Sequence, residues 1–271
     1  MTPSYWGTEY VRIVKELNID VEGDRRASEF LSQRFKDSSC ILPELSKVIS
    51  CKVSVVVGAS DNVHEDLQAL EQALHGFRND VCLFSADSAT PAVLDAGLVP
   101  DFVVTDLDCT EPELLKAFSC GSLFFVHGHA DNLRSLEYWV PKIKGRAEPT
   151  CQIPDPAGHV HNFGGFTDGD RAVHIASALG ARTIVLVGMC LSCGVSELSS
   201  RGKAATPSWV ARKTKKLEIA RRCLSLHARH RTETSVFQCA KRADPVLPFP
   251  NIEPDVFPEL VLRTRADNSI F

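Results

Sequence analysis

The sequence alternates short apolar runs with stretches of helical periodicity, and this alternation most constrains the fold. The runs are rich in β-branched and aromatic residues: Val53–Val57, Val81–Ser85, Phe102–Thr105, Leu123–Val126 and Ile184–Val187. Such runs are typical of strands buried on both faces of a parallel sheet. The stretches between them predict helices at His64–Leu74, Thr90–Ala96, Glu111–Phe118, Asp131–Val140 and Asp170–Leu179. Strand and helix in repeated order predict an α/β fold, with a mostly parallel sheet, helices on both faces and a Rossmann-like arrangement.

Further segments complete the predicted organisation. The N-terminal part predicts two helices, at about Glu9–Asn18 and Asp24–Phe35, and Pro207–Ala228 predicts a C-terminal basic helix whose apolar residues share one stripe. The predicted parts are an N-terminal helical segment (1–50), an α/β catalytic domain (51–240) with a last strand at Thr234–Gln238, and a C-terminal tail (241–271) that wraps the surface from Pro245.

The balance of charge and hydropathy excludes several classes of protein. Lys and Arg number 30 against 34 Asp and Glu, a net charge of −4, so the chain as a whole is no general binder of nucleic acid. A hydrophobic content of 44% and a charged content of 24% indicate a globular protein. No uncharged stretch approaches the ~20 residues that cross a bilayer, and the N-terminus lacks the pattern of a secretory signal. We therefore expect a cytoplasmic protein with no membrane or nucleic-acid partner.

Ten cysteines are scattered along the chain, and only Cys190 and Cys193 have the CxxC spacing. A tetrahedral zinc site usually requires a second Cys or Cys/His pair at similar spacing, and none follows. We therefore expect buried, reduced cysteines, which agrees with a reducing compartment.

Charge is unevenly distributed along the chain. Residues 79–113 contain eight acids and no Lys or Arg, whereas residues 201–231 contain ten Lys and Arg and one acid, Glu218. An acidic part followed by a basic part suits a protein that binds a cation together with a polyphosphate. A solvated basic helix face without a partner explains the charges equally well.

Polar clusters follow the predicted strands at their carboxyl ends, where ligands bind in open parallel sheets. The clusters are Gly58-Ala59-Ser60, Asp87-Ser88, Asp106-Leu107-Asp108, the run from His127 to Asn132 and, at the start of a helix, the run from Asn162 to Arg171. Since the carboxyl ends of parallel strands meet at one edge of a sheet, these clusters predict one shared site.

Asp106 and Asp108 lie two residues apart, so their side chains can point the same way. Two carboxylates about 4 Å apart repel by about 4 kcal/mol at an effective dielectric constant of about 20. No Lys or Arg is near in sequence, and oxygen ligands suit Mg²⁺, so the pair predicts a magnesium site. Alternatively, one carboxylate caps the next helix and the other faces solvent.

His127, His129 and Asp131 have a spacing that could chelate zinc. The other histidines are dispersed, however, and Asp131 suits the N-cap of the following helix. We therefore favour both histidines as contacts to substrate or phosphate.

The run from Gly164 to Arg171 combines glycines, which let a ligand approach the backbone, with a helix N-terminus, which attracts anions. Asp168 and Asp170 could contact metal or substrate, and Arg171 could contact phosphate. Helix capping explains one of the two aspartates but not both. The chain has no GxxxxGK[ST] motif, which excludes a Walker-type loop, and Gly58-Ala59-Ser60 alone is only a weak indication of a phosphate loop.

Taken in order, these motifs resemble the archaeal 6-hydroxymethyl-7,8-dihydropterin pyrophosphokinase family, which is related to the thiamin pyrophosphokinases. The resemblance extends from about Val53 to Ala228 and includes the basic helix with Lys213 and Lys216. It implies Mg²⁺-dependent transfer of diphosphate from ATP to the hydroxymethyl group of the pterin with release of AMP, a step of tetrahydromethanopterin or folate biosynthesis. One departure is Cys190, which stands where the family pattern has an acidic residue.

The residues and the resemblance together assign expected roles. Asp106 and Asp108 are expected to hold Mg²⁺ and to act in catalysis with Asp131. The expected contacts to substrate are Asp87, His127, His129, Asn132, Thr167, Asp168 and Asp170. The expected contacts to ATP are Gly58, Ala59, Ser60, Arg171, Lys213 and Lys216. The expected partners are ATP and a small hydroxymethyl acceptor, with a homodimer possible.

Two other functions remain open at this point. Asp106-Leu107-Asp108-Cys109-Thr110 matches the DxDxT start of haloacid-dehalogenase-like phosphatases, in which the first Asp is a nucleophile, although the acidic pair that this class needs later is not supplied at Cys190. The departure at Cys190 also fits a catalytically silent nucleotide-binding module. The acceptor, pterin or thiamin, is not fixed by the residues themselves.

Overall fold

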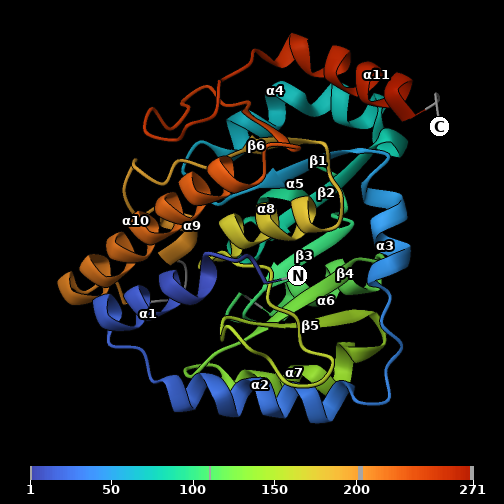
Figure 1. The fold of residues 1–271 in the computed structure, drawn as a ribbon. Coiled ribbons are helices and arrows are strands. Elements are labelled where there is room, and N and C mark those ends of the chain that lie inside the picture. Colours follow the sequence, from blue (N-terminus) through green and yellow to red (C-terminus); the bar gives the residue numbers. More distant parts are fainter. Residues whose placement is uncertain (1, 110, 201–203, 269–271) are drawn as a thin grey trace.

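The computed structural model describes residues 2–109, 111–200 and 204–268, and within them it shows one sheet of seven parallel strands (Figure 1). The strands are β1 (Val53–Val57), β2 (Val81–Ala86), β3 (Phe102–Thr105), β4 (Leu123–Gly128), β5 (Ala147–Cys151), β6 (Thr183–Val187) and β7 (Ser235–Gln238). Their order in the sheet is β5-β4-β3-β2-β1-β6-β7. The predicted α/β class with a parallel sheet is confirmed.

The strand order changes direction beside β1, and this places a crevice at the carboxyl edge of the sheet. From β1 to β5 each strand is added on one side, whereas β6 and β7 are added on the other. Loops that follow β1 and β6 therefore diverge, as at the ligand-binding switch point of other open α/β sheets. The Gly58 N–H donates to the Val187 carbonyl (2.9 Å), and the Ser60 N–H donates to the Gly188 carbonyl (2.9 Å). A Cβ at Gly58 would lie 2.8 Å from the Gly188 oxygen, so this close approach requires a glycine.

Helices cover both faces of the sheet (Figure 1). They are α1 (Trp6–Leu17), α2 (Val21–Phe35), α3 (Leu42–Ile49), α4 (Val63–Gly76), α5 (Thr90–Asp95), α6 (Glu111–Ser119), α7 (Leu133–Ile143), α8 (Asp168–Ala178), α9 (Glu197–Ser200), α10 (Pro207–His230) and α11 (Phe257–Asn268). Successive side chains of a strand point to opposite faces. On β1, Val55 and Val57 therefore pack in the core with α4 and α5, whereas Val56 packs with α8.

The N-terminal segment packs directly against the sheet. Its two predicted helices are confirmed as α1 and α2, and their apolar residues share a core with β3 and β4. The Trp6 indole N–H donates to the Gln152 carbonyl (2.7 Å), and Arg222 of α10 forms an ion pair with Glu9 of α1 (2.6 Å). Figure 1 shows α1 beside α10 and α2 beside β5, which brings the α1–α2 connection to the carboxyl edge of the sheet.

Four elements differ from the sequence prediction, one of them the short helix α9, which was not predicted. The edge strand β5 was not predicted, because its sequence contains Glu148 and Pro149 and lacks an apolar run; an edge strand tolerates proline. The helix α3 was also not predicted. The tail from Pro245 was expected only to wrap the surface, but it contains α11, which packs Phe257 and Val261 into the core with α4 and β1.

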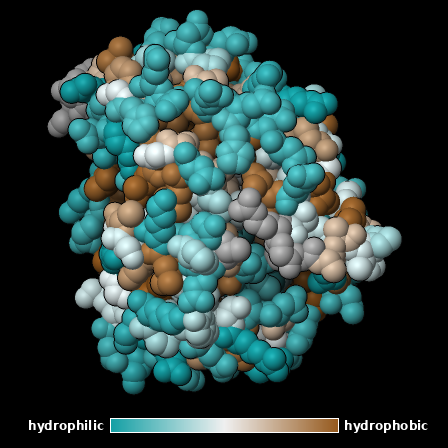
Figure 2. All heavy atoms as spheres, turned by 180° about the vertical axis from the view of Figure 1, so that it is seen from behind, coloured by the Kyte–Doolittle hydropathy of each residue, from teal (hydrophilic) through white to brown (hydrophobic). Residues whose placement is uncertain are grey.

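The face of the molecule drawn in Figure 2 is largely polar. Figure 2 shows one face covered mainly by hydrophilic residues, with hydrophobic ones exposed between them. Among the described helices, none combines the length and the apolar character needed to cross a membrane.

Candidate functional site

Two adjoining cavities open at the carboxyl edge of the sheet. The larger has a volume of about 450 Å³ and the smaller of about 90 Å³. Four residues line both cavities and form the wall between them: Ser88, Thr167, Asp168 and Lys213. A single elongated ligand that contacts this wall can therefore extend into both cavities.

Most of the residues expected at the site line one of these cavities. The larger cavity is lined by Asp106, Asp108, His127, His129, Asp131, Asn132, Thr167, Asp168, Arg171, Lys213 and Lys216. The smaller cavity is lined by Gly58, Ala59 and Ser60. Asp87 and Asp170 line neither, and both are fully buried. Asp131 is exposed at the larger cavity and precedes α7, whose N-cap is Asn132.

Asp87, Asp106 and Asp108 form an acidic cluster at the ends of β2 and β3. One oxygen from each carboxylate lies within 4.8 Å of the other two. Leu107, between two of them, adopts a left-handed conformation (φ 66°), which is uncommon for a residue with a branched side chain. Its N–H donates to Thr105 Oγ1 (2.7 Å), whose hydroxyl donates to Asp87 Oδ1, so the local backbone links the carboxylates.

The acidic cluster fits a divalent cation. Asp87 is 1% exposed, and within the described chain its Oδ2 has no hydrogen-bond partner. Burial and the nearby Asp106 carboxylate raise the pKa of Asp87 well above its ordinary value. Burial, together with Asp106, raises the pKa of Asp168 to about 8, even though Arg171 opposes the shift. A cation held by carboxylate oxygens would remove this repulsion, and an all-oxygen donor set suits Mg²⁺.

Asn132 connects the acidic cluster to the end of β4. Its amide group donates to the backbone carbonyls of Asp106 (2.8 Å) and His127 (2.7 Å) and accepts from the His129 N–H (2.9 Å). The Asn132 side chain, which was expected to contact substrate, is therefore engaged by three backbone groups that belong to the ends of β3 and β4. His129 Nε2 lies 3.2 Å from Asp106 Oδ2, which fixes that carboxylate beside the cavity.

His127 is a buried, neutral histidine beside the larger cavity. Burial lowers its pKa well below the ordinary value. Its Nδ1 lies 3.2 Å from Thr150 Oγ1, and its Nε2 has no hydrogen-bond partner among the described residues. A buried nitrogen without a partner is rare in native proteins, and at a cavity wall it indicates a ligand contact.

The start of α8 separates the roles of two aspartates. Asp170 accepts bonds from the N–H groups of Phe166 (2.7 Å) and Thr167 (2.7 Å), as in a capping box, so its carboxylate is used by the backbone and lies away from the cavities. Asp168 lines both cavities and pairs with Arg171 (3.2 Å). Gly165 (φ 79°) crosses closely over this helix start, where a Cβ would lie 2.5 Å from the Arg171 Cα.

The basic helix α10 faces the acidic cluster across the larger cavity. Lys213 and Lys216 line that cavity, and burial lowers the pKa of Lys216 while the Asp106 carboxylate opposes the shift. Arg212 donates to the Leu17 carbonyl (2.9 Å), which ties α10 to the end of α1. The acidic part (residues 79–113) and the basic part (residues 201–231) of the sequence therefore meet in one cavity. A basic helix face that only contacts solvent would not require this.

Sequence reasoning missed the part of the larger cavity that the N-terminal segment supplies. Asn18, Ile19, Asp20 and Asp24 line it, together with Gln152, Phe166, Trp209 and Arg212. Asp24 is buried and accepts bonds from the Tyr10 hydroxyl (2.7 Å), Gln152 Nε2 (2.6 Å) and the Ala130 N–H (2.9 Å). No local motif marks this loop, because only tertiary packing brings it to the site.

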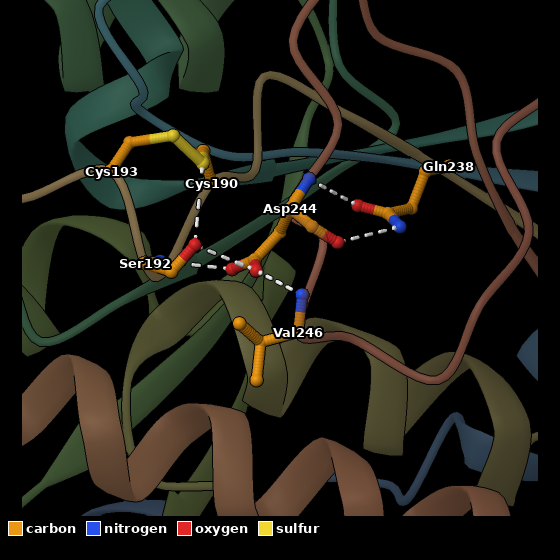
Figure 3. The surroundings of a disulfide bond; sticks show 6 residues. All are labelled: Cys190, Ser192, Cys193, Gln238, Asp244 and Val246. Atoms are coloured by element: carbon orange, nitrogen blue, oxygen red, sulfur yellow. Dashed lines mark hydrogen bonds between the residues drawn. A yellow bond between two sulfur atoms is a disulfide. The ribbon is translucent and has the colours of Figure 1, made fainter.

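The expectation that all cysteines are reduced is wrong for Cys190 and Cys193, which form a disulfide (Figure 3). Figure 3 shows the loop between them held by Asp244, which accepts from the Ser192 N–H (2.9 Å) and the Ser192 hydroxyl (2.8 Å). Asp244 is itself fixed by Gln238, whose Oε1 accepts from the Asp244 N–H (2.8 Å). Cys190 lines the smaller cavity, so a covalently closed loop forms part of that cavity.

Comparison with known proteins places this site in context. Residues 31–194 match the family model described as 6-hydroxymethylpterin diphosphokinase MptE-like. The chain is 42% identical over 224 residues to a 6-hydroxymethyl-7,8-dihydropterin pyrophosphokinase from Pyrococcus furiosus, covering 81% of this chain and 91% of that one. It is 34% identical over 189 residues to one from Methanothermobacter thermautotrophicus, covering 70% and 78%. A solved glycosyltransferase, MAf from Magnetospirillum magneticum, is similar at a TM-score of 0.41 and 13% identity, covering 84% of this chain and 42% of that one.

Proposed function

The chain belongs to the MptE-like 6-hydroxymethylpterin diphosphokinase family, and we propose that it transfers diphosphate from ATP to 6-hydroxymethyl-7,8-dihydropterin with Mg²⁺, releasing AMP. The observation that carries this proposal is the acidic cluster facing Lys213, Lys216 and Arg171 around one cavity. Carboxylates opposite basic side chains suit a polyphosphate that is bound together with its metal ion.

Asp87, Asp106 and Asp108 are proposed to hold Mg²⁺, which would neutralise phosphate oxygens when bound. The basic side chains neutralise the remaining charge. Positioning and charge neutralisation supply most of the catalysis in phosphoryl transfer, so the chain needs no covalent intermediate for this chemistry.

The two cavities suggest how the substrates are arranged. The loop Gly58–Ser60 in the smaller cavity is proposed to contact the nucleoside end of ATP, with the phosphates passing over the shared wall at Thr167 and Asp168. The pterin is then placed in the larger cavity, between the N-terminal loop at Asn18 and the end of β4 at His127. This arrangement puts the reacting groups beside the acidic cluster.

In the proposed reaction the hydroxymethyl oxygen of the pterin bonds to the β-phosphorus of ATP while the bond from that phosphorus to the α,β-bridging oxygen breaks. AMP carries that oxygen away. The hydroxyl proton passes to a base, for which we propose His127, because its imidazole is neutral and its Nε2 has no hydrogen-bond partner in the described chain.

The test is to incubate the protein with ATP, Mg²⁺ and a panel of acceptors that includes the pterin and thiamin. We expect AMP and the pterin diphosphate in equal amounts, and loss of both in Asp106→Asn. Formation of an aspartyl-phosphate on Asp106 would instead favour the phosphatase alternative, for which the motif residue Thr110 lies outside the described residues. ATP binding with no AMP from any acceptor would favour a silent module.

A further inference from the structure

A second group of side chains with metal-ligating atoms lies at the far edge of the sheet. Cys40 Sγ, a carboxylate oxygen of Glu148 and a ring nitrogen of His161 lie within 4.8 Å of one another. Glu148 belongs to the edge strand β5, Cys40 to the connection between α2 and α3, and His161 to the loop before α8. None of the three lines either of the two cavities described above.

The backbone holds these three side chains in place. His161 pairs with β5 on both sides, since its N–H donates to the Pro149 carbonyl (3.0 Å) and its carbonyl accepts from the Cys151 N–H (3.0 Å). Glu148 Oε1 accepts from the Ile41 N–H (3.1 Å), which anchors the residue after Cys40. Three separate segments of the chain are thus fixed around one point before any ligand binds.

One polar atom at this point, the buried His161 Nε2, lacks a hydrogen-bond partner within the described residues. Glu148 is 5% exposed, and its Oε2 lies 3.7 Å from His161 Nε2, too far for a hydrogen bond. Cys40 is a free, exposed thiol beside them. A buried ring nitrogen without a hydrogen-bond partner, 3.7 Å from the carboxylate of a buried glutamate, is an arrangement expected around a cation position.

We propose that Cys40, Glu148 and His161 bind Zn²⁺. Zinc takes Cys sulfur at about 2.3 Å and His nitrogen or carboxylate oxygen at about 2.0–2.2 Å, so tetrahedral ligand atoms lie roughly 3.3–3.7 Å apart. The 3.7 Å between Glu148 Oε2 and His161 Nε2 agrees with this spacing, and the Cys40 sulfur lies within 4.8 Å of a ligand atom of each. A sulfur and nitrogen donor set selects zinc over magnesium, and water or the exposed His159 supplies the fourth ligand.

The zinc would fasten the α2–α3 connection and the loop before α8 to the edge strand. Metal that binds the folded chain stabilises it by mass action, so zinc is expected to raise the melting temperature of the protein. This site is independent of the proposed function, because its ligands do not contact the cavity in which ATP and pterin are placed.

The experiment uses the full chain, stripped of metal, with excess Mg²⁺ present to occupy the acidic cluster. Cobalt replaces zinc as a spectroscopic probe, because a thiolate bound to Co²⁺ gives a charge-transfer absorption in the near ultraviolet. We expect this absorption in the parent protein, its displacement by Zn²⁺, and a loss of Co²⁺ affinity of about 100-fold or more in Cys40→Ser and His161→Ala.

Matched variants test whether cysteines other than Cys40 give the Co²⁺ absorption. Cys120→Ser replaces another exposed free thiol, and Cys193→Ser opens the disulfide; both should keep the absorption. Circular dichroism checks that each variant is folded. The proposal is overturned if the folded parent protein shows no thiolate absorption with Co²⁺, or if Cys40→Ser keeps it unchanged. Pterin diphosphate formation is measured on the same samples, so failure of the zinc site and failure of the proposed function are read separately.

Discussion

The two groups of metal-ligating side chains in this molecule differ in donor atoms and in position on the sheet. Asp87, Asp106 and Asp108 offer oxygen alone, at the carboxyl ends of inner strands and opposite a basic helix. Cys40, Glu148 and His161 offer sulfur, nitrogen and oxygen, at an edge strand and away from the cavities. The first set suits a hard cation shared with phosphate, and the second suits a cation that joins protein segments.

This contrast teaches that the neighbours of a ligand set matter as much as the set itself. The acidic cluster lies beside the cavity lined by Lys213, Lys216 and Arg171, so a polyphosphate bound there with a cation would contact charges of both signs. The edge cluster (Cys40, Glu148 and His161) is surrounded by backbone hydrogen bonds of β5 and its flanking loop. A cation bound there would therefore change the stability of the protein rather than its chemistry. The following predictions separate these two behaviours.

The largest effect is expected from Asp106→Asn. Removing one carboxylate charge from the proposed magnesium site should lower the rate of AMP formation by about 1,000-fold, while the protein remains folded. Steady-state kinetics with the pterin and ATP measure this effect. Cys40→Ser is the matched control from the other cluster and should leave the rate unchanged; an equal loss in both variants would contradict the separation of roles.

A smaller loss is expected from His127→Asn. If His127 accepts the hydroxyl proton, this change should lower kcat by about 100-fold with little change in the KM for ATP. The pH profile of kcat distinguishes a proton acceptor from a packing residue, because loss of the base should remove the acidic limb of the profile. A retained acidic limb would show that another group takes the proton.

A still smaller effect, a weaker binding of ATP, is expected from the double variant Lys213→Ala with Lys216→Ala. The loss of two cations that line the larger cavity should raise the KM for ATP by about 30-fold and affect the pterin less, because charged hydrogen bonds to phosphate are lost. Lys215→Ala is the matched control on the same helix, since Lys215 pairs with Glu218 (3.1 Å) and lines neither cavity. A larger effect on the pterin than on ATP would reverse the proposed arrangement.

The smallest effect concerns pH in the absence of metal. The pKa of Asp168 is raised to about 8 in the folded chain. Its protonated carboxyl therefore contributes stability that is fully present at a pH below the ordinary pKa of aspartate in the unfolded chain. That stability is lost as the pH rises towards 8. The melting temperature of Asp168→Asn relative to the parent protein should therefore increase by a few degrees between pH 5 and pH 8. Added Mg²⁺ should reduce this difference, and zinc should not.

The motif at the end of β3 could be predicted from sequence because it is local. Asp106 and Asp108 follow an apolar run directly, and strand geometry alone places them at the carboxyl edge. The same reasoning located the Gly58 loop and the start of α8. It did not separate Asp168 from Asp170, although Thr167 and Asp170 have the spacing of a capping box, in which Asp170 accepts from the Thr167 N–H.

The remainder of the site depends on contacts between distant segments. Asp24 and Asn18 reach the larger cavity because α1 and α2 pack on β4 and α10, and no periodicity in the first 50 residues indicates this. The strand β5 was not predicted because Glu148 and Pro149 interrupt its apolar character. The edge cluster was not predicted either, because Glu148 belongs to this strand. The possible homodimer stays a prediction.

The central claim is tested most directly by counting the products of ATP when the pterin, Mg²⁺ and the protein are mixed. The account predicts one AMP for each pterin diphosphate formed, no AMP without the pterin, and loss of both products in Asp106→Asn. Release of ADP or inorganic phosphate instead, or AMP that forms equally without the pterin, would contradict it.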